Sequence, residues 1–205
     1  MADVKITDLT SASTPLAGTE LFEVVQGGTS KKVAASDIGN SADALPYASL
    51  AGRAYLSAYS NTDQTGNTGA ATAVKIENSN FGSGISITNN GSGNPTRITY
   101  AAAGTYMLAP SLQFANSDSS DHEVNIWFRK NGTDVPNSNT LINVPKAADG
   151  GNSFFQIVFY EQMTAGQYLE IMWLPSNVAV TLDYIAAGAI APAAPSAIVS
   201  SERIA

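Results

Sequence analysis

The strongest constraint on the fold is a period-two pattern of apolar residues that recurs along the chain with no helical pattern between the repeats. The clearest case is Glu123–Lys130, where Val124, Ile126 and Phe128 share one face of an expected strand. Asn131-Gly132 follows directly and predicts a two-residue hairpin. Similar segments recur at fairly even spacing: Tyr55–Tyr59, Arg97–Tyr100, Thr105–Phe114, Phe154–Glu161, Tyr168–Leu174 and Ser196–Ser201.

This arrangement predicts an all-β protein, an antiparallel β-sandwich with the jelly roll as its leading version. Only 13% of the residues are charged, and Ser, Thr, Asn and Gly are abundant. Such a composition suits short strands and turns better than helices, which use more Glu, Lys and Leu. We find no repeat of fixed period, which argues against solenoids and propellers.

Residues 1–40 differ from the rest of the chain. A strand over residues 20–26 is followed by Gly27-Gly28 and a return strand over 31–34, which predicts a hairpin. So few large apolar residues do not stabilise about 40 residues alone. We therefore expect a small β-rich arm, either flexible or an anchor that becomes ordered on a partner. A linker over 41–52 and a head domain over 53–205 complete the expected organisation.

If residues 1–40 are an anchor, their larger apolar side chains are the ones that reach a partner. We expect apolar contacts and strand addition to the edge of a partner's sheet. The candidate anchoring residues are Leu9, Leu16, Leu21, Phe22 and Val24.

Charge and cysteine content exclude several classes of protein. The chain carries a formal net charge of −7, whereas a nucleic-acid-binding protein needs a basic surface. No apolar run approaches the roughly 20 residues of a membrane helix, and the first residues lack the apolar stretch of a secretory signal. The absence of cysteine removes disulfides and thiolate sites and suits synthesis in a reducing compartment. We expect neither nucleic-acid nor membrane partners.

No catalytic constellation is visible. The single histidine, His122, precedes a strand within a polar loop, and the chain has no G-x-S-x-G motif to supply a nucleophile. Asp118, Asp121 and Glu123 lie too close in sequence to His122 to surround one metal ion, and their spacing matches no calcium loop. We expect a solvated loop there, and we expect neither enzymatic activity nor a cofactor or metal site.

The more informative feature is an excess of apolar surface. Glu123–Lys130 and Phe154–Glu161 place aromatic residues on both faces, and we expect the second segment to be buried on both sides. A sandwich needs only one apolar face per sheet, so the other face is covered either by a neighbouring subunit or by packing within the same subunit. Under the first alternative, the subunit-interface residues are Trp127, Phe154, Tyr160 and Tyr168.

Three segments occur in an order that resembles a known head domain. They are Gly104–Leu108, Val124–Val135 with its Lys130-Asn131-Gly132 hairpin, and Met163–Ile171. Together they resemble the tumour necrosis factor-like and complement-type globular head, which implies a jelly roll that assembles as a tight trimer. At the turn, Ala165-Gly166-Gln167-Tyr168 stands where that family usually has Gly-Asp.

Further segments look like structural proteins of tailed bacteriophages. Val135–Thr140 and Pro192–Pro195 are similar to the phage version of this head. The opening segments Ile6–Leu9, Thr14–Leu21 and Val24–Gly28, with Lys31–Val33, are similar to the start of many phage fibre and decoration proteins. The resemblance covers about residues 4–38 and 97–200.

The resemblance implies a virion protein made in the bacterial cytoplasm, with residues 1–40 as the anchor and a homotrimeric head. Three roles follow. The short linker and the absence of a heptad-repeat shaft favour a capsid decoration (cement or head-fibre) protein on the capsid surface, with the major capsid protein as partner. Alternatively, a short tail fibre or receptor-binding knob attaches to a tail or portal-vertex protein and binds host surface glycans through loops such as Asn61–Asn94 and Ser117–Asp121. A glycan-acting enzyme is the third and weakest option.

Overall fold

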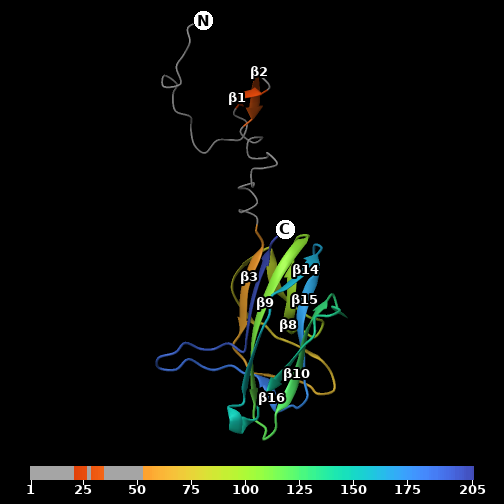
Figure 1. Ribbon diagram of the computed structural model, residues 1–205, viewed down its shortest axis with the longest axis vertical. Helices are drawn as coiled ribbons and strands as arrows, with labels where there is room; N and C mark the ends of the chain where they lie inside the picture. Colours follow the sequence, from red (N-terminus) through yellow and green to blue (C-terminus); the bar gives the residue numbers. More distant parts are fainter. Residues whose placement is uncertain (1–20, 27–28, 35–52) are drawn as a thin grey trace. The chain divides into compact units, whose positions relative to one another are not determined.

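The computed structural model describes residues 21–26, 29–34 and 53–205 (Figure 1). The chain divides between Gly52 and Arg53 into two units. In the first unit, β1 (Leu21–Gln26) and β2 (Thr29–Ala34) pair antiparallel with Gln26 opposite Thr29, which is the predicted hairpin. The expected linker over 41–52 lies outside the described residues.

The second unit is a sandwich of two antiparallel sheets (Figure 1), which confirms the predicted fold class. The sheet around β9 contains β3 (Tyr55–Ser60), β4 (Gln64–Thr65), β6 (Asn78–Ser83), β9 (Gly104–Asn116), β13 (Asn152–Gln156), β14 (Phe159–Met163), β16 (Val180–Leu182) and β17 (Ala197–Arg203). The sheet around β10 contains β5 (Thr72–Ala73), β7 (Ile85–Asn89), β8 (Pro95–Tyr100), β10 (His122–Lys130), β11 (Thr133–Asp134), β12 (Thr140–Val144) and β15 (Tyr168–Pro175). We call them the β9 sheet and the β10 sheet.

The connections make the sandwich a jelly roll. The chain crosses from one sheet to the other after β4, β5, β6, β8, β9, β12, β14 and β15. As a result β17 lies between β3 and β9, and β15 lies between β8 and β10, so neighbours within a sheet come from distant parts of the chain. This interleaving of antiparallel strands from two sheets is the jelly-roll arrangement.

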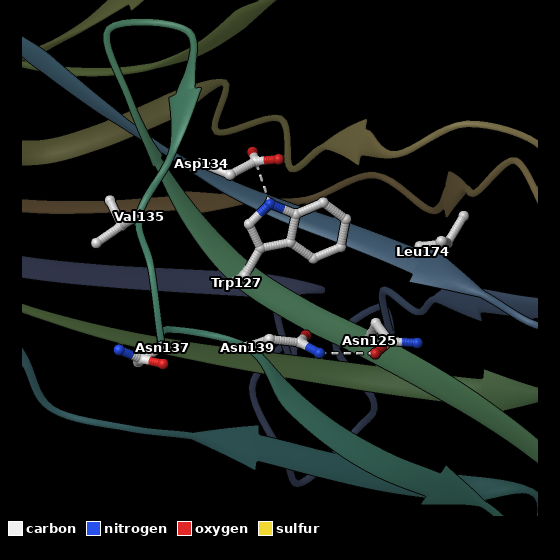
Figure 2. Close-up of a pocket in the computed structure, with 7 residues that line it drawn as sticks. All are labelled: Asn125, Trp127, Asp134, Val135, Asn137, Asn139 and Leu174. Carbon is white, nitrogen blue, oxygen red and sulfur yellow. Dashed lines mark hydrogen bonds between the residues drawn. The ribbon is translucent and has the colours of Figure 1, made fainter.

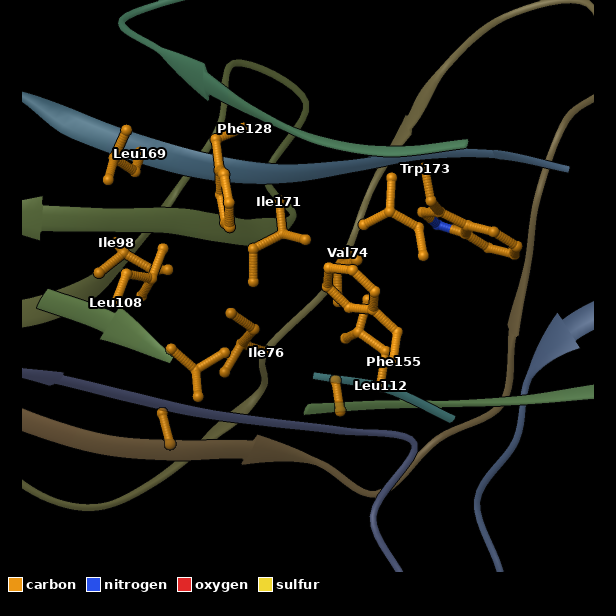
Figure 3. Packing of buried hydrophobic residues seen from close by; sticks show 14 of the residues in the cluster. Val74, Ile76, Ile98, Leu108, Leu112, Phe128, Phe155, Leu169, Ile171 and Trp173 are labelled. Atoms are coloured by element: carbon orange, nitrogen blue, oxygen red, sulfur yellow. The ribbon is translucent and has the colours of Figure 1, made fainter. Parts of the chain in front are cut away.

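The core forms where the inward residues of the two sheets meet (Figure 3). Alternate residues of β9, including Leu108 and Leu112, face Phe128 of β10 and Ile171 of β15, and all four are fully buried. The predicted alternation of β10 is therefore confirmed, because its inward set of Val124, Ile126 and Phe128 is no more than 1% exposed.

The segment Phe154–Glu161 departs from its predicted form. It is two strands, β13 and β14, which pair in one register with the same edge of β9 and are interrupted at Ile157 and Val158. The interruption faces Pro110, which has no N–H to donate to the ladder. The segment is also not buried on both sides in the single chain, since Phe154 and Tyr160 are more than half exposed.

Candidate interaction surfaces

The outward face of the β9 sheet presents large apolar side chains to solvent. We call it the apolar face and define it by six residues that are each 39–61% exposed: Tyr55, Phe81, Phe154, Val158, Tyr160 and Ile198. They occupy outward positions because the alternate residues of the same strands, such as Leu56, Phe155 and Val199, fill the core. Water-exposed apolar area of this kind is a marker of association.

One row across the middle of the apolar face has small side chains, with Ile198 two positions along β17 and aromatic residues at the margins. Register places Ala109 of β9 beside Ser200 of β17, and Ser200 beside Ser57 of β3. Phe154 and Tyr160 stand on one side of this small-residue centre. On the other side Tyr55 and Phe81 pack edge to face, with ring centroids 5.9 Å apart. The face therefore offers aromatic margins and a small-residue centre that differ in shape.

Charge is nearly absent from the apolar face. Among the described residues at outward positions of β3, β9, β13, β14 and β17, Glu202 is the one charged side chain. Depletion of charged residues with enrichment of Tyr and Phe is the compositional signal of an interface core.

A loop between β16 and β17 adds a second apolar surface. Residues 185–195 contain only Ile, Ala, Gly and Pro, and this loop projects from the sandwich (blue in Figure 1). Ile185 and Ala194 exchange backbone hydrogen bonds of 3.0 and 2.8 Å at its base, and Ile190 is fully exposed. Ile185 and Phe154 both line a depression of about 260 Å³, so the loop is continuous with the apolar face.

The four predicted subunit-interface residues fall into two pairs on opposite sides of the sandwich. Phe154 and Tyr160 belong to the apolar face. Trp127 and Tyr168 lie on the outward side of the β10 sheet, because Phe128 and Leu169 beside them point into the core. One flat contact therefore cannot include all four residues.

Trp127 lines a shallow groove that the Asn131-Gly132 hairpin helps to build (Figure 2). Asn131 and Gly132 both have positive φ, as the predicted tight turn requires, and the turn brings Asp134 opposite Arg129. We call this the indole groove; it measures about 420 Å³ and is lined by Asn125, Trp127, Asp134, Val135, Asn137, Asn139 and Leu174.

Hydrogen bonds hold the polar side chains of the indole groove. Trp127 donates its Nε1–H to Oδ1 of Asp134 at 2.8 Å, and Arg129 Nε donates to the same oxygen at 2.7 Å. The bond from Arg129, followed by the one from Trp127, lowers the pKa of Asp134 below its usual value. On the opposite side of the ring, Asn139 Nδ2 donates to Oδ1 of Asn125 at 2.8 Å (Figure 2).

Tyr168 is part of a separate structural cluster on the β10 sheet. Its ring lies under the Arg97 guanidinium, 4.2 Å from the ring centroid. Arg97 Nε is 4.0 Å from the carboxylate of Glu170, which is mostly buried and accepts a 2.6 Å hydrogen bond from Thr96. These contacts pair the mostly buried carboxylate of Glu170 within the subunit, and the predicted interface role of Tyr168 stays a prediction.

The loop around His122 has internal hydrogen bonds that the predicted solvated loop did not include. His122 Nε2 and Asp118 Oδ2 are 2.6 Å apart, and this bond lowers the pKa of Asp118. Asp118 also accepts from the backbone N–H of Ser119 and from Asn177, so it joins two loops. Its contacts are those of a loop-closing residue, and in the described residues no group of three or more His, Cys, Asp or Glu is placed to hold a metal ion.

The candidate anchoring residues lie in the first unit. Leu21, Phe22 and Val24 belong to β1. Leu9 and Leu16 lie outside the described residues.

The sequence analysis did not select Tyr55, Phe81 and Ile198 of the apolar face, nor Asn125 and Asn139 of the indole groove. A usable signal existed for Tyr55, because Leu56 and Ala58 alternate with it as inward residues. Ile198 could have been found in the same way, between Ala197 and Val199. No local signal exists for the Asn125–Asn139 bond, because it depends on how the chain returns after the hairpin.

Comparisons with known proteins found similar solved structures. The crystal structure of murine APRIL at pH 5.0 is similar with 8% sequence identity and a TM-score of 0.47, over 74% of this chain and 99% of that chain. Murine APRIL at pH 8.0 and pH 8.5 matches with 7% identity and TM-scores of 0.47 and 0.46, over the same shares. No family model and no curated protein matches the sequence. Within the residues that the structure describes, no helix is long and apolar enough to cross a membrane.

Proposed function

We propose that the chain is a trimeric structural protein of a bacteriophage virion, attached to the capsid surface by its N-terminal unit. The observation that carries the assembly is the apolar face, with six large exposed apolar residues and a single charge at its outward strand positions. Burying a large apolar side chain contributes about 1.5–3 kcal/mol. A few such residues supply the free energy that a subunit contact needs after the cost of association.

The layout of the apolar surfaces favours a closed ring over a twofold dimer. A ring needs two different surfaces that fit each other, whereas a twofold contact uses one self-complementary surface. The face supplies an aromatic margin at Phe154 and Tyr160, continued by the 185–195 loop, and a centre of small residues. In the proposed trimer, the aromatic margin of each subunit packs on the small-residue centre of the next.

Attachment is assigned to residues 1–40, with the major capsid protein as partner. The hairpin of β1 and β2 is a two-stranded sheet, so each strand has one edge unpaired in the described chain. A two-stranded hairpin is marginally stable alone, and an open strand edge accepts a strand from another protein. The sequence resemblance of residues 4–38 to phage fibre and decoration proteins supplies the kind of partner.

A second candidate function is a short tail fibre or receptor-binding knob attached to a tail or portal-vertex protein. The observation that favours it is the indole groove, which the decoration role does not use. The two candidates differ in copy number, because decoration proteins are numerous and fibres are few. Quantitative mass spectrometry of purified virions against the major shell protein measures that ratio. A ratio near one supports decoration, and a few copies per virion support the fibre.

Assembly and attachment are tested separately. Sedimentation of the full chain should give three times the 21.2 kDa chain mass, and a monomer at all concentrations would contradict the trimer. A chain that lacks residues 1–40 should remain trimeric and no longer bind virions from which the protein has been removed. Binding by this truncated chain would contradict the anchor, and loss of the trimer would move the assembly contact to the first unit.

A further inference from the structure

The indole groove has no role in the proposed trimer or in attachment to the capsid, and an inference about its ligand deepens the second candidate function, the receptor-binding knob. We propose that it binds a neutral pyranose unit of a glycan, with Trp127 as the stacking platform and Asn125, Asn139 and Asp134 as hydroxyl-binding groups. Its volume of about 420 Å³ lies within the range of roughly 300–1,000 Å³ that is usual for small-ligand sites.

The aromatic part of the argument is the orientation of Trp127. Figure 2 shows the indole ring between Asp134 and the Asn125–Asn139 pair, with Leu174 beyond its six-membered ring. The bond from Nε1 to Asp134 fixes the ring plane, so little side-chain freedom remains to be lost on binding. The face of an indole is electron-rich and attracts the C–H groups on the apolar side of a pyranose.

The polar part is the set of hydrogen-bonding groups left around the ring. In the described part of the chain, Asn125 Nδ2, Asn139 Oδ1 and Asp134 Oδ2 have no protein partner. They offer donors and acceptors in planar amide and carboxylate groups, and sugar hydroxyls act as both donors and acceptors. A purely apolar ligand would leave these groups unsatisfied.

Charge selects a neutral sugar. Asp134 places a carboxylate in the groove, and the nearby cation of Arg129 is already paired with it at 2.7 Å. The lining residues contain no Lys or Arg, so a sialic acid or a phosphorylated sugar would meet repulsion without compensation.

This binding site is independent of the proposed trimer. It lies on the outward side of the β10 sheet, opposite the apolar face, so the groove stays open when subunits assemble through the β9 sheet. A trimer would then carry three grooves, and weak single-site binding would gain from multivalency. Failure of trimer formation would leave the single-site measurement below intact.

The two tryptophans give a direct readout. Trp173 is fully buried, whereas Trp127 is partly exposed, so acrylamide quenches the emission of Trp127 selectively. The full chain is titrated with methyl hexopyranosides of the gluco, manno and galacto series and with sialic acid. At least one neutral hexoside should protect Trp127 from acrylamide in a saturable way, and sialic acid should not. Failure of all three hexosides, or protection by sialic acid alone, overturns the proposal.

Variants locate the binding. N139A should weaken hexoside binding by about tenfold, which corresponds to about 1.4 kcal/mol, and W127A should abolish it, both measured by titration calorimetry. W127F keeps a stacking ring and should retain weakened binding, which separates loss of the platform from loss of folding. Y168A changes an aromatic residue on the same side of the β10 sheet but outside the groove, and should bind like the unmodified chain. Undiminished binding by W127A would contradict the site.

Discussion

The outward faces of the β9 and β10 sheets are made by strands that follow one another along the chain, yet their surfaces differ in kind. The β9 sheet exposes six large apolar residues and carries one charge at its outward strand positions. The outward side of the β10 sheet carries Arg97, Arg129 and Glu170, each in contact with another side chain of the same subunit, and the exposed Glu123. Both faces belong to one jelly roll and pack on one core.

The difference between the two faces lies in whether their exposed groups are paired within the subunit or need another surface to cover them. Several charged groups of the β10 sheet find partners within the subunit, as Glu170 does with Thr96, while polar groups of the indole groove keep unused hydrogen-bonding capacity. The apolar face has no such partners and gains free energy only when another surface covers it. A face whose charges are mostly paired internally but which keeps a few unpartnered polar groups is suited to a small polar ligand, and an exposed apolar face is suited to assembly.

Removing the aromatic margin should have the largest effect. Replacing both Phe154 and Tyr160 by Ser should dissociate the trimer, because the pair contributes about 3–6 kcal/mol per subunit at about 1.5–3 kcal/mol each. Analytical ultracentrifugation measures the loss. The matched control is L141S, which removes a 53% exposed apolar residue from the β10 sheet. Equal dissociation by the control would show that the two faces do not differ in role.

Breaking the internal polar cluster should cost less and should act on folding instead of assembly. T96V removes the 2.6 Å bond to the mostly buried Glu170 and should lower the free energy of unfolding by about 1.5–3 kcal/mol. Urea unfolding measures the change. T133V, at an exposed position of β11, should stay within about 0.5 kcal/mol of the unmodified chain. A change in the mass of the oligomer with T96V would contradict the assignment of this cluster to folding instead of assembly.

Acid should weaken the hydrogen bonds of the indole groove. The pKa of Asp134 is lowered in the folded state, so its stabilising contribution is complete above the usual value of about 3.9 and is lost as the pH falls through the lower folded value. The effect is about 0.2–1 kcal/mol because Asp134 is largely exposed. Emission of Trp127, followed from pH 6 to pH 2, should change in this window. The change should be absent in D134N.

Salt should have the smallest effect. The apolar face has one charged residue at its outward strand positions, so the trimer dissociation constant should change by less than about tenfold between 0.1 and 1 M NaCl, where the Debye length falls from about 10 to 3 Å. Sedimentation equilibrium at the two salt concentrations tests this. A large weakening in high salt would mean that ion pairs hold the subunits together.

The alternation of apolar residues predicted which side chains face inward but not which sheet a strand joins. Val124, Ile126 and Phe128 are buried as expected, and Asn131-Gly132 forms the expected hairpin. Trp127 and Phe154 look equivalent in the sequence, since each is an aromatic residue on the outward side of a strand. They lie on opposite sides of the sandwich because the chain crosses between sheets after β12, and no local pattern records such a crossing.

The interruption of β13 and β14 is a similar case. Its cause, Pro110, lies more than 40 positions earlier in the chain and acts only because β9 is the neighbour of that segment. The indole groove likewise depends on pairing. Asn125 and Asn139 are brought together by the return of the chain from the hairpin into β12.

The position of β17 has a consequence for biosynthesis. This strand lies between β3 and β9, and its Glu202 pairs with Tyr55 at the start of the head. At about 5–20 residues per second, the ribosome makes residue 202 roughly 7–30 s after residue 55. During that interval β17 is missing, so one edge of β3 and one edge of β9 are unpaired and apolar core residues are exposed to water. Folding of the head is therefore completed only after almost the whole domain has left the ribosome, and chaperones that hold nascent chains should raise its yield.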